Sequence, residues 1–286
     1  MSPGFPDWGT PLRDSVNALL EALISRHGDQ FEAVSATLLK LLVPLEQGLR
    51  GAPAWVTLLA VAALAGAVSR RWHFALAVAG GLWLIGALGQ WDQAMQSLAL
   101  VIVAVLLCLV MGLPLGVLCA RSALLRSLVT PLLDLMQTIP SFVYLLPAAM
   151  LFGLGKVPAI LATVIYALPP LVRLTDLGLR QVPLDALEAG RVLGANRWQV
   201  LVRIQVPMAW PAILQGLNQT TMMSLAMVVV ASMIGARGVG ETVLIGLQRN
   251  DPGLGLVGGL VIVVLAMVLD RSLQAAGRRH SAPPRS

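Results

Sequence analysis

Residues 188–207, EAGRVLGANRWQVLVRIQVP, form a polar segment between two strongly apolar regions of the chain. Pro183, shortly before it, suits the first turn of a helix, where a backbone N–H has no helical partner to lose. Gly194 is placed to end that helix in a left-handed conformation, which glycine adopts at little cost. Asn196 and Gln199 have the spacing of a capping box for a second helix. The segment therefore predicts a short helical elbow.

The composition on both sides of this elbow predicts a membrane protein. Of the 286 residues, 57% are hydrophobic and only 12% are charged, whereas a soluble domain is about one-quarter charged. A spanning helix needs roughly 20 apolar residues. We expect an all-α polytopic helical bundle with about seven spans, or five to six if the first two are re-entrant. The apolar runs lie near 54–69, 74–89, 97–120, 131–152, 157–178, 206–233 and 253–270.

The distribution of basic residues predicts the orientation. Under the seven-span reading, most of the 20 Lys and Arg residues lie on the side that holds the elbow and the C-terminus. That side is then cytoplasmic, with the N-terminus outside. The net charge of +6 is thus a sign of topology, and we do not expect nucleic acid as a partner.

The regions before and after the central spans have patterns of their own. In residues 1–52, apolar residues recur at helical spacing on either side of Gly28 and Asp29, which predicts two amphipathic helices on the outer face. Residues 53–90 would form two accessory spans. Residues 274–286 are polar and Pro-rich, which predicts a disordered cytoplasmic tail.

The elbow resembles the cytoplasmic-loop signature of ABC-importer permeases. That signature runs Glu-Ala-Ala, three residues, Gly, nine residues, Ile, one residue, Leu-Pro; here Gly190 replaces the second Ala and Val206 replaces the Leu, with every spacing kept. The resemblance implies a type I importer permease over residues 91–273, with a loop over 180–207 that couples it to an ATPase. The coupling residues would be Glu188, Ala189, Gly190, Gly194, Ile204 and Pro207. Because a helical Gly costs about 1 kcal/mol relative to Ala, we expect Gly190 to loosen the elbow.

Longer segments resemble the branch of these permeases that imports glycine betaine, proline betaine, choline and related solutes. They are LDLMQTIPSFVYLLPAAMLFGLGKVP (133–158), ALPPLVRLTDLGLRQVP (167–183) and LNQTTMMSLAMVVVASMIGARGVGETVL (217–244). The resemblance implies an osmoprotective importer of a quaternary-ammonium solute or proline in a bacterial inner membrane. Its partners would be two ATPase subunits, an extracytoplasmic solute-binding protein and a second copy of this chain.

The chain itself is expected to be non-catalytic. Its two lysines, Lys40 and Lys156, lie outside any phosphate-binding loop sequence, and such a loop needs a lysine beside its backbone amides. ATP and Mg²⁺ would therefore bind the partner ATPase, and we expect no cofactor or metal in this chain.

Two polar clusters at membrane depth are candidates for the translocation path. They are Gln137, Thr138, Pro140 and Ser141, and Asn218, Gln219, Thr221 and Ser224. Polar groups are costly in lipid, so these should face protein or water; hydrogen bonding between helices is the alternative. Phe142 and Tyr144 form a candidate gate, with packing as the alternative role.

Several residues near the span ends have expected structural roles. Gly112 and Gly116 have the spacing of a helix-packing motif, although Pro114 between them favours a kink. Three acidic residues are expected to pair with nearby arginines rather than carry protons: Asp134 with Arg126, Asp176 with Arg173, and Asp270 with Arg271.

Two other function classes are less consistent with the sequence. An ion-coupled secondary transporter would show internal repeats and an intramembrane carboxylate pair, but the sequence shows no repeat and its acids lie at span ends. A membrane enzyme would need a nucleophile–base pair or a metal cluster at depth. Within the family that the elbow resembles, a permease for a different small solute is the alternative.

Overall fold

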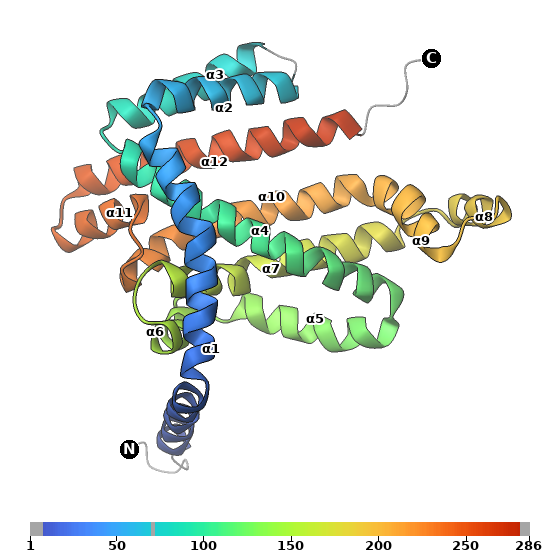
Figure 1. Ribbon diagram of the computed structural model, residues 1–286, viewed down its shortest axis with the longest axis horizontal. Coiled ribbons are helices and arrows are strands. Elements are labelled where there is room, and N and C mark those ends of the chain that lie inside the picture. The colour runs from blue at the N-terminus through green and yellow to red at the C-terminus, as the bar shows by residue number, and fades with distance from the viewer. Residues whose placement is uncertain (1–7, 70–71, 281–286) are drawn as a thin grey trace.

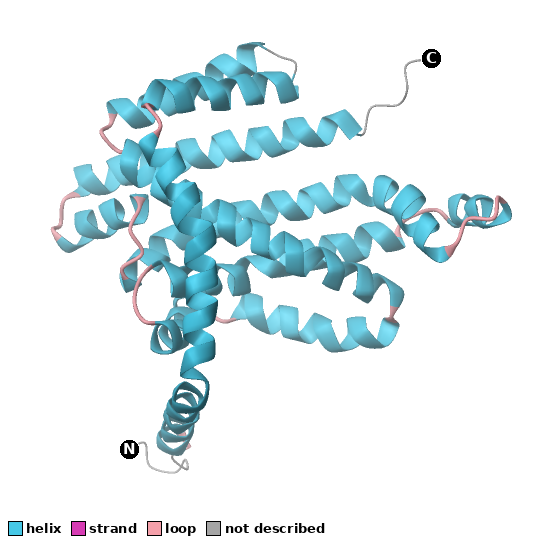
Figure 2. Cartoon of the chain, viewed as in Figure 1, coloured by secondary structure: helices cyan, strands magenta, loops and turns pink. Residues whose placement is uncertain are grey.

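The computed structural model describes residues 8–69 and 72–280, and this part of the chain is helical apart from short loops (Figures 1 and 2). The longer helices are α1 (Gly9–Gly51), α2 (Ala54–Ser69), α3 (Trp72–Ala87), α4 (Trp91–Arg121), α5 (Ala123–Thr138), α7 (Lys156–Arg180), α10 (Val206–Ala231) and α12 (Pro252–His280). The shorter ones are η1 (Ser141–Tyr144), α6 (Leu145–Phe152), α8 (Leu184–Val192), α9 (Arg197–Val200), η2 (Leu201–Gln205), η3 (Ser232–Ile234) and α11 (Val239–Gln248).

The candidate spans in the described residues are fewer than the seven expected and include the alternative of five or six. Within the described residues, four helices are long and apolar enough to cross a membrane, or up to six if each of two bent helix pairs is one span. Helices α2 and α3 have 16 residues each, which at 1.5 Å per residue is about 24 Å, short of a hydrocarbon core of roughly 30 Å. The expected span over 131–152 is broken at Pro140, where the two helical arms meet at 103°. Proline lacks the N–H that would continue the helical ladder.

The core of the bundle is the close packing of α4, α7 and α10. A Cβ added to Gly116 of α4 would lie 2.6 Å from the Cβ of Thr175, and one on Gly216 of α10 would lie 3.1 Å from the Cα of Leu171, both on α7. The glycines therefore allow α7 to approach both neighbours. Helix α4 continues past Pro114, and its Gly112 and Gly116 both face α7, so the packing interpretation of this motif is confirmed.

The N-terminal segment forms one long helix with a kink. Helix α1 has non-helical backbone angles at His27, next to the predicted break at Gly28. It lies across the bundle instead of along it, as Figure 1 shows. Contacts to the bundle include the ring of Phe31, which meets Phe152 of α6 edge-on with the ring centroids 5.2 Å apart. This helix therefore braces the side of the bundle.

The C-terminal region is more ordered than predicted. Helix α12 continues to His280, so the expectation of a disordered tail is wrong for residues 274–280, while residues 281–286 lie outside the described part. The Gln274 amide donates to both carboxylate oxygens of Asp270 at 2.9 Å. The two residues are four positions apart, so this contact spans one helical turn and stabilises α12 beyond Asp270.

Two of the three expected ion pairs have different partners. Asp134 of α5 pairs with Arg173 of α7, and Asp176 accepts from Nε of Arg180, one turn along α7, at 3.0 Å. Asp270 has Arg271 nearby at 3.9 Å, as expected. Asp134 pairs with Arg173 because α5 packs on α7, which places Arg173 opposite Asp134.

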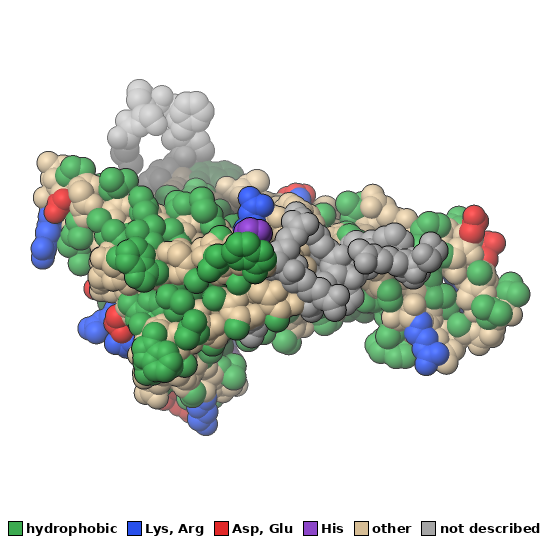
Figure 3. All heavy atoms as spheres, turned by 90° about the horizontal axis from the view of Figure 1, so that it is seen from above, with side chains coloured by type: hydrophobic (Ala, Val, Ile, Leu, Met, Phe, Trp, Pro, Cys, Tyr) green, Lys and Arg blue, Asp and Glu red, His purple; other side chains and the backbone are tan. Residues whose placement is uncertain are grey.

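Large hydrophobic side chains are exposed along the outside of the bundle. Trp72, Leu76 and Trp83 of α3 are each more than half exposed. In Figure 3, hydrophobic side chains cover much of the face between the two ends of the molecule. A surface of this kind fits lipid or another membrane subunit better than water.

Candidate functional site

The elbow protrudes from one end of the bundle, opposite the end that holds α6 and α11 (Figure 1). Pro183 precedes the first residue of α8, and Gly194 after it has φ +82°. The backbone N–H of Ala195 donates to the carbonyl of Gly190 at 3.0 Å across this left-handed residue. The prediction that Gly194 ends this helix in a left-handed conformation is therefore confirmed.

The second half of the elbow begins at the predicted capping box. The Asn196 Oδ1 accepts from the Gln199 backbone N–H at 2.8 Å, and the Gln199 Oε1 accepts from the Asn196 backbone N–H at 2.9 Å. Helix α9 then continues through η2 into α10, so residues 197–234 form one helical segment. A displacement of the elbow would consequently move α10, which packs on the core helix α7.

A small core of its own joins the two halves of the elbow. Val182, Leu187 and Val200 are buried, with Ala195 and Ile204 packed beside them. A Cβ on Gly190 would overlap Cδ1 of Ile204. Helix α8 thus lies against the Ile204 side chain at Gly190, and the expectation that Gly190 loosens the elbow stays a prediction.

The remaining coupling candidates lie on the outside of the elbow. Glu188, Ala189 and Pro207 are exposed. Next to them, Val192 and Leu193 are 86% and 87% exposed, and Trp198 is 66% exposed. Sequence reasoning missed these three apolar residues, although apolar side chains inside a polar segment were a usable signal. Their exposure makes the tip of the elbow a surface that a partner protein could cover.

The polar residues of α10 mostly bond within the bundle. Thr221 donates to the Leu217 carbonyl and Ser224 donates to the Thr220 carbonyl, both at 2.8 Å. The Asn218 amide donates to Asp270 of α12 at 2.7 Å. The Asn218 contact matches the alternative of hydrogen bonding between helices, whereas the two hydroxyl groups bond within α10. Gln219 is exposed.

The second cluster lies at the bend between α5 and η1. Gln137, Thr138 and Pro140 are exposed, and Ser141 is half-buried at the start of η1. Of the two candidate gate residues, Phe142 is 59% exposed. The Tyr144 hydroxyl donates to the Met136 carbonyl at 2.9 Å, which ties η1 back to the end of α5. Tyr144 therefore has a structural contact. Among the candidate path residues, the side-chain amides of Gln137 and Gln219 are more accessible than that of Asn218.

Comparison with known families identifies the bundle. The sequence pattern of the family described as "Binding-protein-dependent transport system inner membrane component" matches residues 112–281, more than half of the chain. The chain belongs to this family of transport permeases. The matched region includes the elbow, both polar clusters and α12, whereas α1, α2 and α3 of this permease lie before it.

Two relatives named as betaine permeases are similar to this permease over most of its length. It is 46% identical over 268 residues to the glycine betaine/proline betaine transport system permease protein ProW of Escherichia coli (strain K12), covering 94% of this chain and 75% of that one. It is 40% identical to the glycine betaine transport system permease protein OpuAB of Bacillus subtilis (strain 168), covering 92% of this chain and 93% of that one.

A solved structure shares the fold of the permease. A chain of the MetNI methionine ABC transporter, in inward-facing conformations, matches with a TM-score of 0.60 at 21% identity, over 65% of this chain and 94% of that one. At this identity the similarity concerns the fold alone. It confirms the expected architecture of an ABC-importer permease.

Proposed function

We propose that this permease is the membrane subunit of an ATP-driven importer for a quaternary-ammonium compatible solute such as glycine betaine, proline betaine or choline. The observation that carries this proposal is the similarity, at 46% and 40% identity over more than nine-tenths of the chain, to permeases named for betaine transport. The geometry of the elbow supports it, because an exposed tip continuous with α10 is suited to pass movement into the bundle.

The proposed assembly contains two copies of the permease, two ATPase subunits and an extracytoplasmic solute-binding protein. The ATPase would cover Glu188, Val192 and Leu193 at the tip of the elbow, and ATP with Mg²⁺ would bind there and not in this chain. The elbow would then be cytoplasmic and the N-terminal end of α1 would lie outside. A membrane-impermeant thiol reagent should accordingly label Ser15→Cys, but not Ala195→Cys, in intact cells.

Solute uptake tests the proposal directly. The permease would be produced with its ATPase and binding protein in a bacterium that lacks other betaine importers, and uptake of radiolabelled glycine betaine would be measured. Unlabelled proline betaine, choline and proline would be added as competitors. ATP-dependent uptake competed by betaines supports the proposal; uptake that only a solute without a quaternary ammonium group competes would assign the permease to another substrate class.

A further inference from the structure

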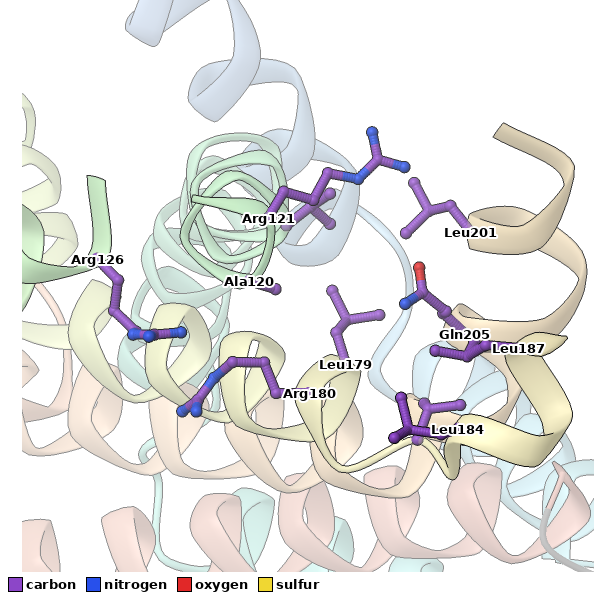
Figure 4. A pocket seen from close by; sticks show the side chains of 11 residues that line it. Ala120, Arg121, Arg126, Leu179, Arg180, Leu184, Leu187, Leu201 and Gln205 are labelled. Atoms are coloured by element: carbon purple, nitrogen blue, oxygen red, sulfur yellow. The ribbon is translucent and has the colours of Figure 1, made fainter. Parts of the chain in front are cut away.

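A pocket of about 400 Å³ lies where the elbow joins the bundle. Its lining comes from the end of α4, the start of α5, the end of α7, the elbow helix α8 and η2 (Figure 4). The side chains fall into two groups. The basic group is Arg121, Arg126 and Arg180, and the apolar group includes Val117, Leu179, Leu184, Leu187 and Leu201.

The pocket carries uncompensated positive charge. None of the residues that line it is acidic. Arg180 is neutralised by Asp176, which accepts from its Nε at 3.0 Å and from its second terminal nitrogen at 3.1 Å. Arg121 and Arg126 have no ion-pair partner among residues 8–69 and 72–280. In Figure 4 the Arg126 side chain lies beside Arg180, and the Arg121 side chain extends on the other side of the pocket, toward Leu201. An anion between these sides would compensate the charges of Arg121 and Arg126.

The apolar lining indicates what kind of anion would fit. Leu179 and Leu201 are almost fully buried, and leucine side chains from three elements face the same space as the guanidinium groups. A free inorganic anion would satisfy the arginines but leave this apolar surface against water. A molecule with an anionic head and an attached hydrocarbon part would satisfy both.

The position in the membrane indicates the source. Arg121 and Arg180 are the last residues of candidate spanning helices and Arg126 lies near the start of α5. A bilayer around these spans would place its head groups beside the pocket. Basic pockets between helices at this depth are suited to anionic lipid head groups. Guanidinium groups also match the geometry of phosphate oxygens.

We propose that this pocket binds the phosphate-containing head group of an anionic phospholipid, with Arg121 and Arg126 as its ligands. The bound lipid would also contact Leu184 and Leu187 of α8, and so would brace the elbow against the bundle. This site goes beyond the transport function, since it concerns a lipid ligand and not the transported solute.

The test measures lipid binding to the purified full-length permease in detergent. Native mass spectrometry would count the lipid molecules retained as phosphatidylglycerol or, separately, phosphatidylcholine is added. We expect the first phosphatidylglycerol to bind more tightly than phosphatidylcholine. The double variant Arg121→Gln/Arg126→Gln should bind phosphatidylglycerol about 30-fold more weakly, from the usual contribution of each basic residue near an anionic leaflet. Arg180 is left in place because its removal would strand Asp176.

The matched control removes the same charge at the other end of the bundle. Arg237→Gln/Arg249→Gln replaces two exposed arginines near α11 and should leave phosphatidylglycerol binding unchanged. If the first double variant fails to fold, Arg126→Gln alone should weaken binding about fivefold, and Arg126→Lys should retain most of it. Equal binding by the wild type and the Arg121/Arg126 variants would overturn the proposal. Complete displacement of the lipid by millimolar sodium phosphate would overturn it too, by showing a free-phosphate site.

Discussion

The Lys156 Nζ lies 2.6 Å from both carboxylate oxygens of Glu46, and this contact joins α1 to the first residue of α7. Glu46 is only 6% exposed, and Arg50 also donates to it at 3.3 Å while pairing with Asp92 of α4. A helix that lies across the bundle is thereby held to two of its core helices by charge as well as by packing.

Lys156→Met is expected to destabilise the permease. It would leave the buried Glu46 carboxylate with only the weaker Arg50 contact, and breaking a buried pair costs several kcal/mol, reduced here to about 2 kcal/mol because Lys156 is partly exposed. Thermal unfolding in detergent would measure the change. The only other lysine of the chain supplies the control, since Lys40→Met removes an exposed charge and should have little effect. Glu46→Gln added to Lys156→Met should recover part of the loss; no recovery would mean that the pair is not the cause.

Gly194→Val is expected to impair transport without preventing membrane insertion. A β-branched residue is strained at φ +82°, by roughly 1–3 kcal/mol, so the two halves of the elbow would meet at a different angle. We expect uptake to fall about tenfold, measured with radiolabelled solute in the assembled importer. Gly194→Asn is the control, because asparagine tolerates the left-handed region better, and it should transport better than the valine variant. Equal activity of the two variants would contradict a conformational role for Gly194.

Glu188→Lys should weaken the attachment of the ATPase. Glu188 is exposed on α8 beside the apolar tip, so the change reverses a charge at the proposed contact. Co-purification of the ATPase with the permease would measure attachment, and ATP hydrolysis together with uptake would measure coupling. Asp185→Lys makes the same charge reversal on the same helix and should have the smaller effect. If attachment and uptake are normal in Glu188→Lys, Glu188 is not a coupling residue.

Gln137→Leu and Gln219→Leu test the translocation path. Both side chains are exposed on the isolated permease, and leucine is at home in lipid, so insertion and thermal stability should change little. If these amides line the path, solute uptake should fall several-fold. Ser224→Ala is the comparison, because Ser224 is buried and bonds within α10; it should change stability more than uptake. Normal uptake in both glutamine variants would remove them from the path.

The purified permease alone should not hydrolyse ATP. Neither Lys40 nor Lys156 lies in a phosphate-binding loop, and Lys156 is already held by Glu46. Release of inorganic phosphate would be measured with the permease alone and after adding its ATPase. Hydrolysis that copurifies with the permease and persists after removal of other chains would contradict the assignment of ATP to the partner.

The local parts of the elbow could be predicted from the sequence because neighbouring residues determine them. The left-handed turn at Gly194 depends on the absence of its own Cβ, and the cap at Asn196 needs only Gln199 three residues later. The membrane class likewise follows from the length and apolarity of the runs. These features are properties of short segments, so they were visible before any packing was known.

Other features depend on how helices far apart in the chain pack together. Glu46 meets Lys156 across 110 positions, and Arg173 lies opposite Asp134 only because α5 packs on α7. The same holds for Gly190, whose missing Cβ makes room for Ile204, and for the gathering of Arg121, Arg126 and Arg180 around one pocket. Whether the helical arms on either side of Pro140 bend or form one straight span also depends on the tertiary structure. Composition and periodicity therefore determined the class of protein and its local turns, whereas only the tertiary structure decided which charges are paired and which side chains share a surface.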